Sequence, residues 1–207
     1  MKIVVLGANG RTGKLVVEGA LTAGDMVTVV VRSDDKRPSI KHNHLDLVVG
    51  DPCNPKFLTQ VFKGKDAVIS TLGGRTPSKA ATSVYWKSAD AIVEAAWNAG
   101  LRKVAVTSSA LLFPRTRLFD MLLATMVRNV VKSATRMEET LERSQLDVIV
   151  GRCGFLTNSV ERQYRAEVGS LPEDGSTVSR HGLAQFLVDQ VRKPVTGLKV
   201  YGVSSPA

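Results

Sequence analysis

A chain of 207 residues is long enough to bury one large hydrophobic core and too short for several ordinary domains, so we expect a single domain. Its 43% hydrophobic and 23% charged residues exclude a disordered chain. The net charge is +9, but the basic residues are scattered, without a dense Lys/Arg run or interleaved aromatic residues, which argues against a nucleic-acid partner.

Short apolar runs alternate with longer amphipathic stretches along the chain. The predicted strands are 3–6, 27–31, 45–49, 67–71, 104–107 and 148–150, and the predicted helices are 13–23, 55–62, 82–99, 118–144 and 182–193. Several strands are almost continuous Val, Ile and Leu, as expected where helices cover both faces of a sheet. The alternation predicts an α/β fold, a Rossmann-type doubly wound parallel sheet flanked by helices, as one domain over residues 1–207.

Two stretches are less regular. The helix predicted over 118–144 is long, and we expect a break in it. The segment around 155–180 contains two glycines and a proline and follows the sixth strand. It is either a small substrate-covering region or a plain surface connection, and the sequence leaves both open.

The first turn of the chain has the composition of a phosphate-binding loop. The strand ends at Leu6, the segment Gly7-Ala-Asn-Gly-Arg-Thr-Gly13 follows, and a helix opens directly after it. The glycine spacing is GxxGxxG instead of the common GxGxxG, but both patterns permit a sharp turn, a close approach to pyrophosphate and tight packing of helix on strand. The helix N-terminus adds free N–H groups and a positive dipole end. We therefore predict that a nicotinamide dinucleotide binds to Gly7, Asn9, Gly10, Arg11, Thr12 and Gly13.

The end of the second strand indicates which dinucleotide binds. An acidic residue there suits the ribose 2′-hydroxyl of NAD, whereas arginine accommodates a 2′-phosphate. Arg32 follows the strand directly and Lys36 comes shortly after it, while Asp34 and Asp35 lie past the strand end. These positions favour NADPH (NADP), with Arg11 as a second guanidinium. The alternative for Arg32 is a solvated loop charge.

These motifs and several later ones resemble the atypical, NmrA-like NAD(P)-binding branch of the short-chain dehydrogenase/reductase superfamily. The similar segments are 7–13, 48–51, 67–75, 103–113 and 147–155, and the likeness covers nearly the whole chain. Within that branch the chain is most similar to the biliverdin IXβ reductase/flavin reductase group. It departs from the family where Cys153 replaces the proline of an Arg-Pro-Gly segment and where Gly182 replaces an acidic residue.

The resemblance implies a cofactor site and an acceptor site at the carboxyl ends of the strands. The implied cofactor-binding residues are Asp51 beside the adenine, Leu72, Gly73, Gly74 and Arg75 under the cofactor, Thr107, and Arg152, Cys153, Gly154 and Phe155 near the nicotinamide. The implied catalytic residues are Ser109 and Ser108, which would hydrogen-bond the acceptor; the alternative is a serine that satisfies backbone groups at a strand end. The candidate substrate-binding residues are Leu111, Phe113, Arg115 and Arg117. The alternative for the two arginines is that they are solvated charges in a loop.

The chain lacks the Tyr-x-x-x-Lys pair of alcohol-oxidising relatives. Four residues after Tyr85, Tyr164 and Tyr201 stand Ala89, Val168 and Ser205. The absence argues against a carbonyl/alcohol proton relay and against an isomerase or epimerase. It favours transfer of hydride from NADPH to a conjugated acceptor such as a flavin, a bilin or a quinone, because such acceptors need little acid catalysis. The alternative is a non-catalytic NADP-binding redox sensor or regulator of the NmrA-like type.

The remaining features indicate the surroundings of the protein. No run of about 18 apolar residues occurs, so we expect no membrane association. Cys53 and Cys153 are far apart, and neither they nor the three histidines have metal-ligand spacing, so we predict free thiols, a cytoplasmic location and no metal. Cys153 is either a reactive thiol near the nicotinamide or a buried inert one. We expect a small-molecule partner and a monomer or small homo-oligomer.

Overall fold

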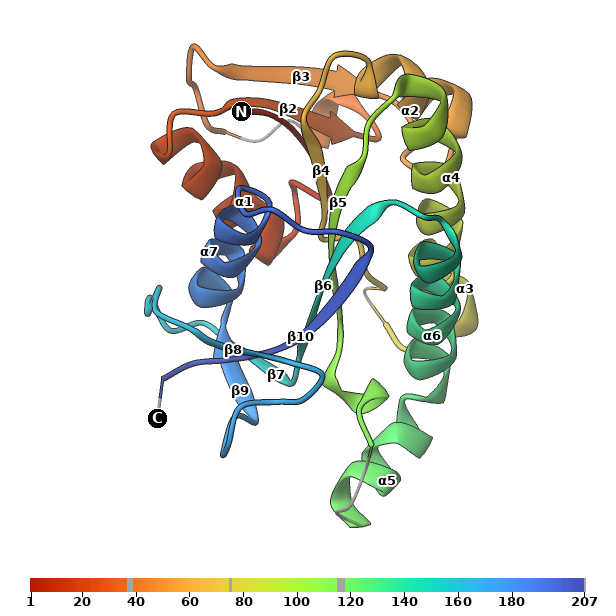
Figure 1. Cartoon of the computed structure of the whole chain (residues 1–207), viewed down its shortest axis with the longest axis vertical. Helices are drawn as coiled ribbons and strands as arrows, with labels where there is room; N and C mark the ends of the chain where they lie inside the picture. The colour runs from red at the N-terminus through yellow and green to blue at the C-terminus, as the bar shows by residue number, and fades with distance from the viewer. Residues whose placement is uncertain (37–38, 75, 115–117, 207) are drawn as a thin grey trace.

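The computed structural model describes residues 1–36, 39–74, 76–114 and 118–206, and its centre is an eight-stranded sheet (Figure 1). The strand order is β3-β2-β1-β4-β5-β6-β10-β8, and only β8 runs antiparallel to its neighbour, β10. The bounds are β1 Lys2–Leu6, β2 Met26–Val31, β3 Leu45–Val49, β4 Ala67–Ser70, β5 Lys103–Ser109, β6 Asp147–Cys153, β8 Arg165–Val168 and β10 Leu198–Ser204. The predicted doubly wound Rossmann-type sheet is confirmed.

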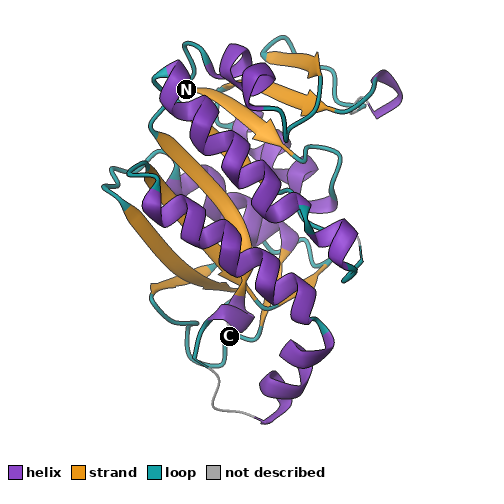
Figure 2. Cartoon of the chain, turned by 90° about the vertical axis from the view of Figure 1, so that its right-hand side faces the viewer, coloured by secondary structure: helices purple, strands orange, loops and turns teal. Residues whose placement is uncertain are grey.

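Helices cover both faces of this sheet (Figures 1 and 2). On one face lie α1 (Arg11–Thr22) and α7 (Arg180–Gln190), which pack against each other. On the other lie α2 (Pro55–Phe62), α4 (Val84–Ala99) and α6 (Arg128–Arg143), with the short α3 (Lys79–Thr82) before α4. The remaining helix, α5 (Leu118–Met126), projects from the body beyond the carboxyl end of β5.

The first strand explains why the sheet has a core on each face. Ile3 and Val5 pack into the cluster under α1 and α7, while Val4 and Leu6 pack into the cluster under α2 and α4. All four side chains are fully buried. Successive side chains of a strand point to opposite faces, so a central strand with a core on each side is apolar throughout.

Two expectations about helices are resolved. The break expected within 118–144 lies at Val127, between the end of α5 and the start of α6. The helix predicted over 82–99 corresponds to the end of α3 and the whole of α4. Ser83 separates the two helices, as the C-cap of α3 and the N-cap of α4. The helix predicted over 55–62 coincides with α2, and those predicted over 13–23 and 182–193 differ from α1 and α7 by one to three residues at each end.

The C-terminal strands were not predicted from the sequence. The strand β10 runs to Ser204, which is fully buried, and the next residue, Ser205, donates its N–H to Thr177 O at 2.9 Å. The pairing of β10 with β6 extends the sheet and holds this segment in place.

The segment around 155–180 is partly regular. It contains β7 (Phe155–Thr157) and β9 (Thr177–Ser179), which pair in parallel as a second small sheet, and the edge strand β8. Gly154 comes so close to this sheet that an added Cβ would lie 2.2 Å from Ser176 O. The segment therefore forms ordered strands beside the main sheet. Its role in covering a substrate stays a prediction.

Candidate functional site

The glycine-rich loop between β1 and α1 is closed by its own backbone. Gly10 N–H donates to Gly7 O at 2.8 Å, and Gly7 has a φ of +84°, in the left-handed region that favours glycine. A Cβ on Gly13 would lie 2.1 Å from Gly7 O and 2.8 Å from Thr71 Oγ1. The helix can thus begin directly against the strand only because residue 13 has no side chain.

The first turn of α1 presents amide groups to a ligand. Its N-cap is Gly10, no side-chain cap bonds to it, and its first turn holds no acidic residue. Uncapped amides at a helix start, together with the helix dipole, form an anion site. The loop therefore fits the pyrophosphate of a dinucleotide, as the sequence predicted.

The adenosine end of the expected site lies at the ends of β2 and β3. Arg32 directly follows β2, and Asp51 comes two residues after the end of the neighbouring strand β3. Both side chains are exposed. Asp51 Oδ1 accepts a hydrogen bond from Cys53 N–H at 2.9 Å. The pKa of the Cys53 thiol is raised by burial first and by Asp51 second, while Lys87 and Arg32 lower it, so these charges gather around one point.

The expected nicotinamide end of the site is the place where β5 and β6 finish side by side. Their register pairs Thr107 with Gly151, Ser108 with Arg152 and Ser109 with Cys153. Cys153 Sγ–H donates to Ser108 O at 3.4 Å, and burial raises the pKa of this thiol to about 12. Cys153 is therefore protonated at neutral pH, which favours the inert thiol over the reactive one.

A buried carboxylate joins Ser108 and Arg152. Glu138 on α6 is 7% exposed and accepts a hydrogen bond from Ser108 Oγ–H at 2.5 Å. Arg152 donates to the same carboxylate through Nη2 at 2.7 Å and Nε at 3.1 Å. The guanidinium carbon of Arg152 also lies 4.6 Å from the centre of the Phe113 ring. These contacts tie α6 to the ends of both strands.

This network bears on two expectations from the sequence. Ser108 has one proton, which it donates to Glu138. Arg152 is likewise paired with Glu138, and the ligand roles expected for these two side chains stay predictions. Glu138 itself was missed. The available signal was its place in the apolar stripe of α6, beside the buried Ala134, Met137 and Leu141.

Ser109 is the serine whose proton remains available. Its Oγ accepts a hydrogen bond from Leu111 N–H at 3.2 Å and caps the short 3-10 helix Ala110–Leu112. Within the described part of the chain, no acceptor is assigned to the Ser109 hydroxyl proton. The backbone role expected as the alternative is thus present, and it leaves the serine as a donor at the strand end.

Other predicted residues lie around this edge. Leu72 is half-buried against the core, and Gly73 and Gly74 form the turn after β4. Leu111 and Phe113, both half-buried, follow Ser109. Phe155 is 54% exposed. Arg75, Arg115 and Arg117 lie outside the described residues, and the side chain of Lys36 does as well.

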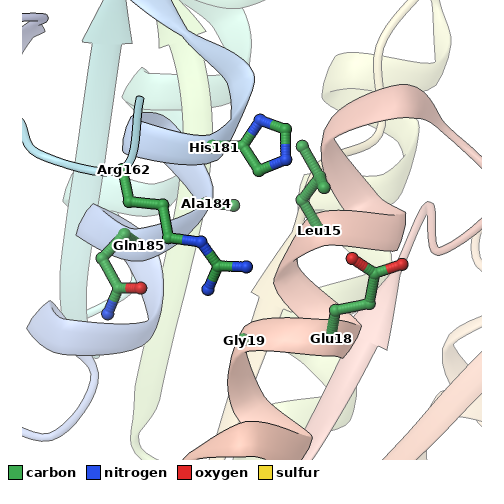
Figure 3. Close-up of a pocket in the computed structure, with 7 residues that line it drawn as sticks. All are labelled: Leu15, Glu18, Gly19, Arg162, His181, Ala184 and Gln185. Atoms are coloured by element: carbon green, nitrogen blue, oxygen red, sulfur yellow. The ribbon is translucent and has the colours of Figure 1, made fainter. Parts of the chain in front are cut away.

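A second concentration of cationic groups lies where α1 and α7 begin. Arg180 is 9% exposed and donates through Nη1 to Thr157 O at 2.8 Å and Asn158 Oδ1 at 2.7 Å. Burial, and then the nearby Arg11, lower the pKa of Arg180. A hollow further along the two helices is lined by Leu15, Glu18, Gly19, Arg162, His181, Ala184 and Gln185 (Figure 3). None of the predicted site residues line that hollow.

Residues 1–36, 39–74, 76–114 and 118–206 hold neither a cluster of metal-binding side chains nor a membrane-spanning helix. These residues bring together no group of three or more His, Cys, Asp or Glu side chains able to hold a metal ion. They also contain no helix of the length and apolarity needed to cross a membrane.

Comparison with known proteins identifies the family. Residues 7–194 match the model of a family described as NAD(P)H-binding. The chain belongs to this NAD(P)H-binding family. The match begins at the first glycine of the loop and extends past α7, so it includes the whole edge described above.

Two curated relatives are photosystem II assembly factors named Ycf39. The protein from Synechocystis is 29% identical over 160 residues, which are 75% of this chain and 45% of the relative. The protein from Trieres chinensis is 33% identical over 111 residues, 53% of this chain and 34% of the relative. This chain therefore aligns with less than half the length of either relative.

Solved structures confirm the fold. An anaerobilin reductase, ChuY, from Escherichia coli O157:H7 has a TM-score of 0.80 and 20% identity, covering 100% of this chain and 98% of that one. A proposed NADH-flavin reductase from Streptococcus pneumoniae has a TM-score of 0.79 and 20% identity, covering both chains completely. A short-chain dehydrogenase/reductase from Veillonella parvula in complex with NADP has a TM-score of 0.77 and 22% identity, covering 100% and 95%. At these identities the likeness shows the fold alone.

Proposed function

We propose that this protein is an NADPH-dependent reductase that transfers hydride to a conjugated acceptor such as a flavin, a bilin or a quinone. One observation carries the proposal: the uncapped glycine loop and the Ser109 hydroxyl lie on the same edge of the sheet. In open α/β sheets, ligands bind at the carboxyl ends of the strands. A dinucleotide held by the loop can therefore extend toward the serine.

The choice of NADPH over NADH rests on the adenosine end. Arg32 is exposed immediately after β2, where a 2′-phosphate would lie, and guanidinium groups bind phosphate through two parallel hydrogen bonds. Arg11 begins α1 and carries no hydrogen bond or ion pair in the described chain. We assign the two arginines and Lys36 to the phosphate groups. The complex of the structurally similar Veillonella parvula protein with NADP is consistent with this choice of cofactor.

The remaining residues position the two ligands. We assign Asp51 to the adenine side and Leu72, Gly73, Gly74 and Thr107 to the floor under the cofactor. The backbones of Arg152, Cys153, Gly154 and Phe155 border the nicotinamide, which supplies the hydride. Ser109 donates a hydrogen bond to the acceptor, and Leu111 and Phe113 offer it an apolar wall. In these roles the residues contribute placement and exclusion of water to the hydride transfer.

The direct test is oxidation of the reduced cofactor. Purified protein is mixed with NADPH or NADH and with FMN, FAD, biliverdin or a quinone, and loss of reduced-nicotinamide absorbance is recorded. Acceptor-dependent turnover that is faster with NADPH supports the proposal. Tight NADPH binding by titration without turnover on any acceptor would contradict it.

A second candidate is a non-catalytic NADP-binding sensor or regulator. It is favoured by the curated relatives, which are assembly factors. The same titration separates the two candidates, because a regulator binds NADPH and NADP with different affinities and consumes neither. A cytoplasmic location and a monomeric or small homo-oligomeric state stay predictions.

A further inference from the structure

Tyr85 lies in the first turn of α4 and reaches the turn that follows β4. A Cβ on Gly73 would lie 3.0 Å from the Tyr85 hydroxyl oxygen and 3.4 Å from the ring carbon that bears it. The phenol therefore occupies space that a side chain at residue 73 would fill. Its ring packs against the core under α4, as Leu72 does. The end of this side chain thus lies at the carboxyl edge of the sheet.

The hydroxyl of Tyr85 is unpaired within the described residues. No hydrogen bond to it is found there, whereas the hydroxyl of Tyr164 donates to Asp189 Oδ2 at 2.9 Å. Moreover, none of the fully buried side-chain oxygens in the described residues lacks a partner. The Tyr85 oxygen must therefore be reached from outside the protein. An unsatisfied hydroxyl sealed from water is destabilising, so this donor needs water or a ligand.

Tyr85 also lies near Cys153, at the end of β6. Burial raises the pKa of Tyr85 above its usual value, and the nearby Cys153 raises it further. The phenol consequently keeps its proton at neutral pH and acts as a donor. Because Cys153 pairs in register with Ser109, the phenol and the Ser109 hydroxyl flank the same stretch of the edge, one from α4 and one from β5.

We propose that Tyr85 is a catalytic residue that hydrogen-bonds a carbonyl or ring-nitrogen atom of the acceptor and protonates it during reduction. The inference rests on the proposed reductase function and assigns a source to the proton. The acceptor gains a hydride from NADPH, which becomes NADP⁺. The Tyr85 O–H bond breaks as the acceptor's oxygen or nitrogen gains the proton, and the phenolate then takes a proton from water.

The test compares Tyr85→Phe with Tyr164→Phe. Both variants lose one hydroxyl, but Tyr164 lies on the other face of the sheet, against Phe186. For Tyr85→Phe, kcat is expected to fall about a hundredfold, which is the rate contribution typical of one general acid. The solvent isotope effect on kcat should also change, because water or buffer must now deliver the proton. Binding of NADPH and thermal stability should stay at wild-type values, and Tyr164→Phe should keep wild-type kcat.

A binding measurement keeps this inference separate from the proposed function. Each acceptor is titrated into protein saturated with NADP⁺, where no turnover occurs. Because Tyr85→Phe loses one hydrogen bond to the acceptor, this variant should bind the acceptor about tenfold more weakly than wild-type protein does. If wild-type protein binds or reduces acceptors and Tyr85→Phe does so equally well, the inference is overturned alone. If wild-type protein neither binds nor reduces any acceptor, both proposals fail.

Discussion

Ser108 on β5 donates its hydroxyl proton to Glu138 on α6, a carboxylate that also holds the guanidinium of Arg152. All three side chains are largely or fully withdrawn from water. A charge in such a place is stable only when paired and hydrogen-bonded, and here one carboxylate accepts both donors. The relationship explains why adjacent serines differ: Ser108 holds the helix to the strand, and Ser109 is left to face the edge.

Removing the charge of Glu138 should destabilise the fold. In Glu138→Gln the buried Arg152 loses its counter-charge, and we expect a loss of about 3 kcal/mol in the free energy of unfolding. Urea unfolding followed by circular dichroism measures this loss. Glu139→Gln is the matched control, since Glu139 is half exposed and its contact with Arg143 is 4.0 Å long. That control should change stability little, and equal stability of the two variants would contradict the proposed network.

Arg32→Ala should separate the two nicotinamide cofactors. The variant loses the guanidinium assigned to the 2′-phosphate, so NADPH should bind about tenfold or more weakly while NADH, which lacks that phosphate, is little affected. Equilibrium titration of each cofactor gives the ratio. Arg143→Ala, which removes an exposed charge from the end of α6, is the control for general electrostatic attraction. Equal weakening of NADPH and NADH by Arg32→Ala would remove the assignment.

Much of this architecture could be predicted because its signals are local. The buried runs of β1 and β2 and the glycine loop are contiguous in sequence, and the loop's role follows from its spacing. By contrast, β10 is interrupted by Lys199 and Gly202, and its pairing with β6 depends on residues far away in the chain. The requirement for glycine at residue 202 is visible only in the fold, because a Cβ there would lie 2.2 Å from Ser170 O.

The candidate site shows the same division. The sequence located Ser109 and the glycine loop, which stand at strand ends. It did not distinguish Glu138 from the exposed Glu139 beside it, because only the position of α6 over β5 and β6 buries one of them. Tyr85 was set aside because no lysine follows it four residues later. Its place beside Gly73 depends on how α4 packs, which no local pattern encodes.

Cys153 should resist alkylation in the folded protein. With a pKa of about 12, only a very small fraction of its thiol is ionised at neutral pH, and the thiolate is the reactive form. Iodoacetamide labelling followed by peptide mass spectrometry should therefore modify Cys153 slowly in native protein and readily in urea. Fast labelling of the native thiol would restore the reactive role that the sequence left open.

The same thiol should make stability fall at alkaline pH. An unfolded cysteine ionises at a pH of about 8.5, whereas folded Cys153 ionises only near 12. Between these values the unfolded state releases a proton that the folded state retains, so the free energy of unfolding decreases as the pH rises. In Cys153→Ala this decrease should be smaller. A pH series of urea midpoints measures the difference, and identical alkaline slopes for the two proteins would exclude the linkage.

Gly13→Ala and Gly19→Ala test the glycine loop within a single helix. At residue 13 the new methyl group would lie 2.1 Å from Gly7 O, so the loop must open and its amides move away from the pyrophosphate. At residue 19 the nearest atom is Val188 Cγ2 at 3.6 Å, an ordinary contact. Alanine also favours helix by about 0.5–1 kcal/mol over glycine, so Gly19→Ala should keep or raise stability and bind NADPH normally. Gly13→Ala should lose NADPH binding in titration and unfold at a lower temperature. Normal NADPH binding by Gly13→Ala would show that the dinucleotide does not depend on this loop.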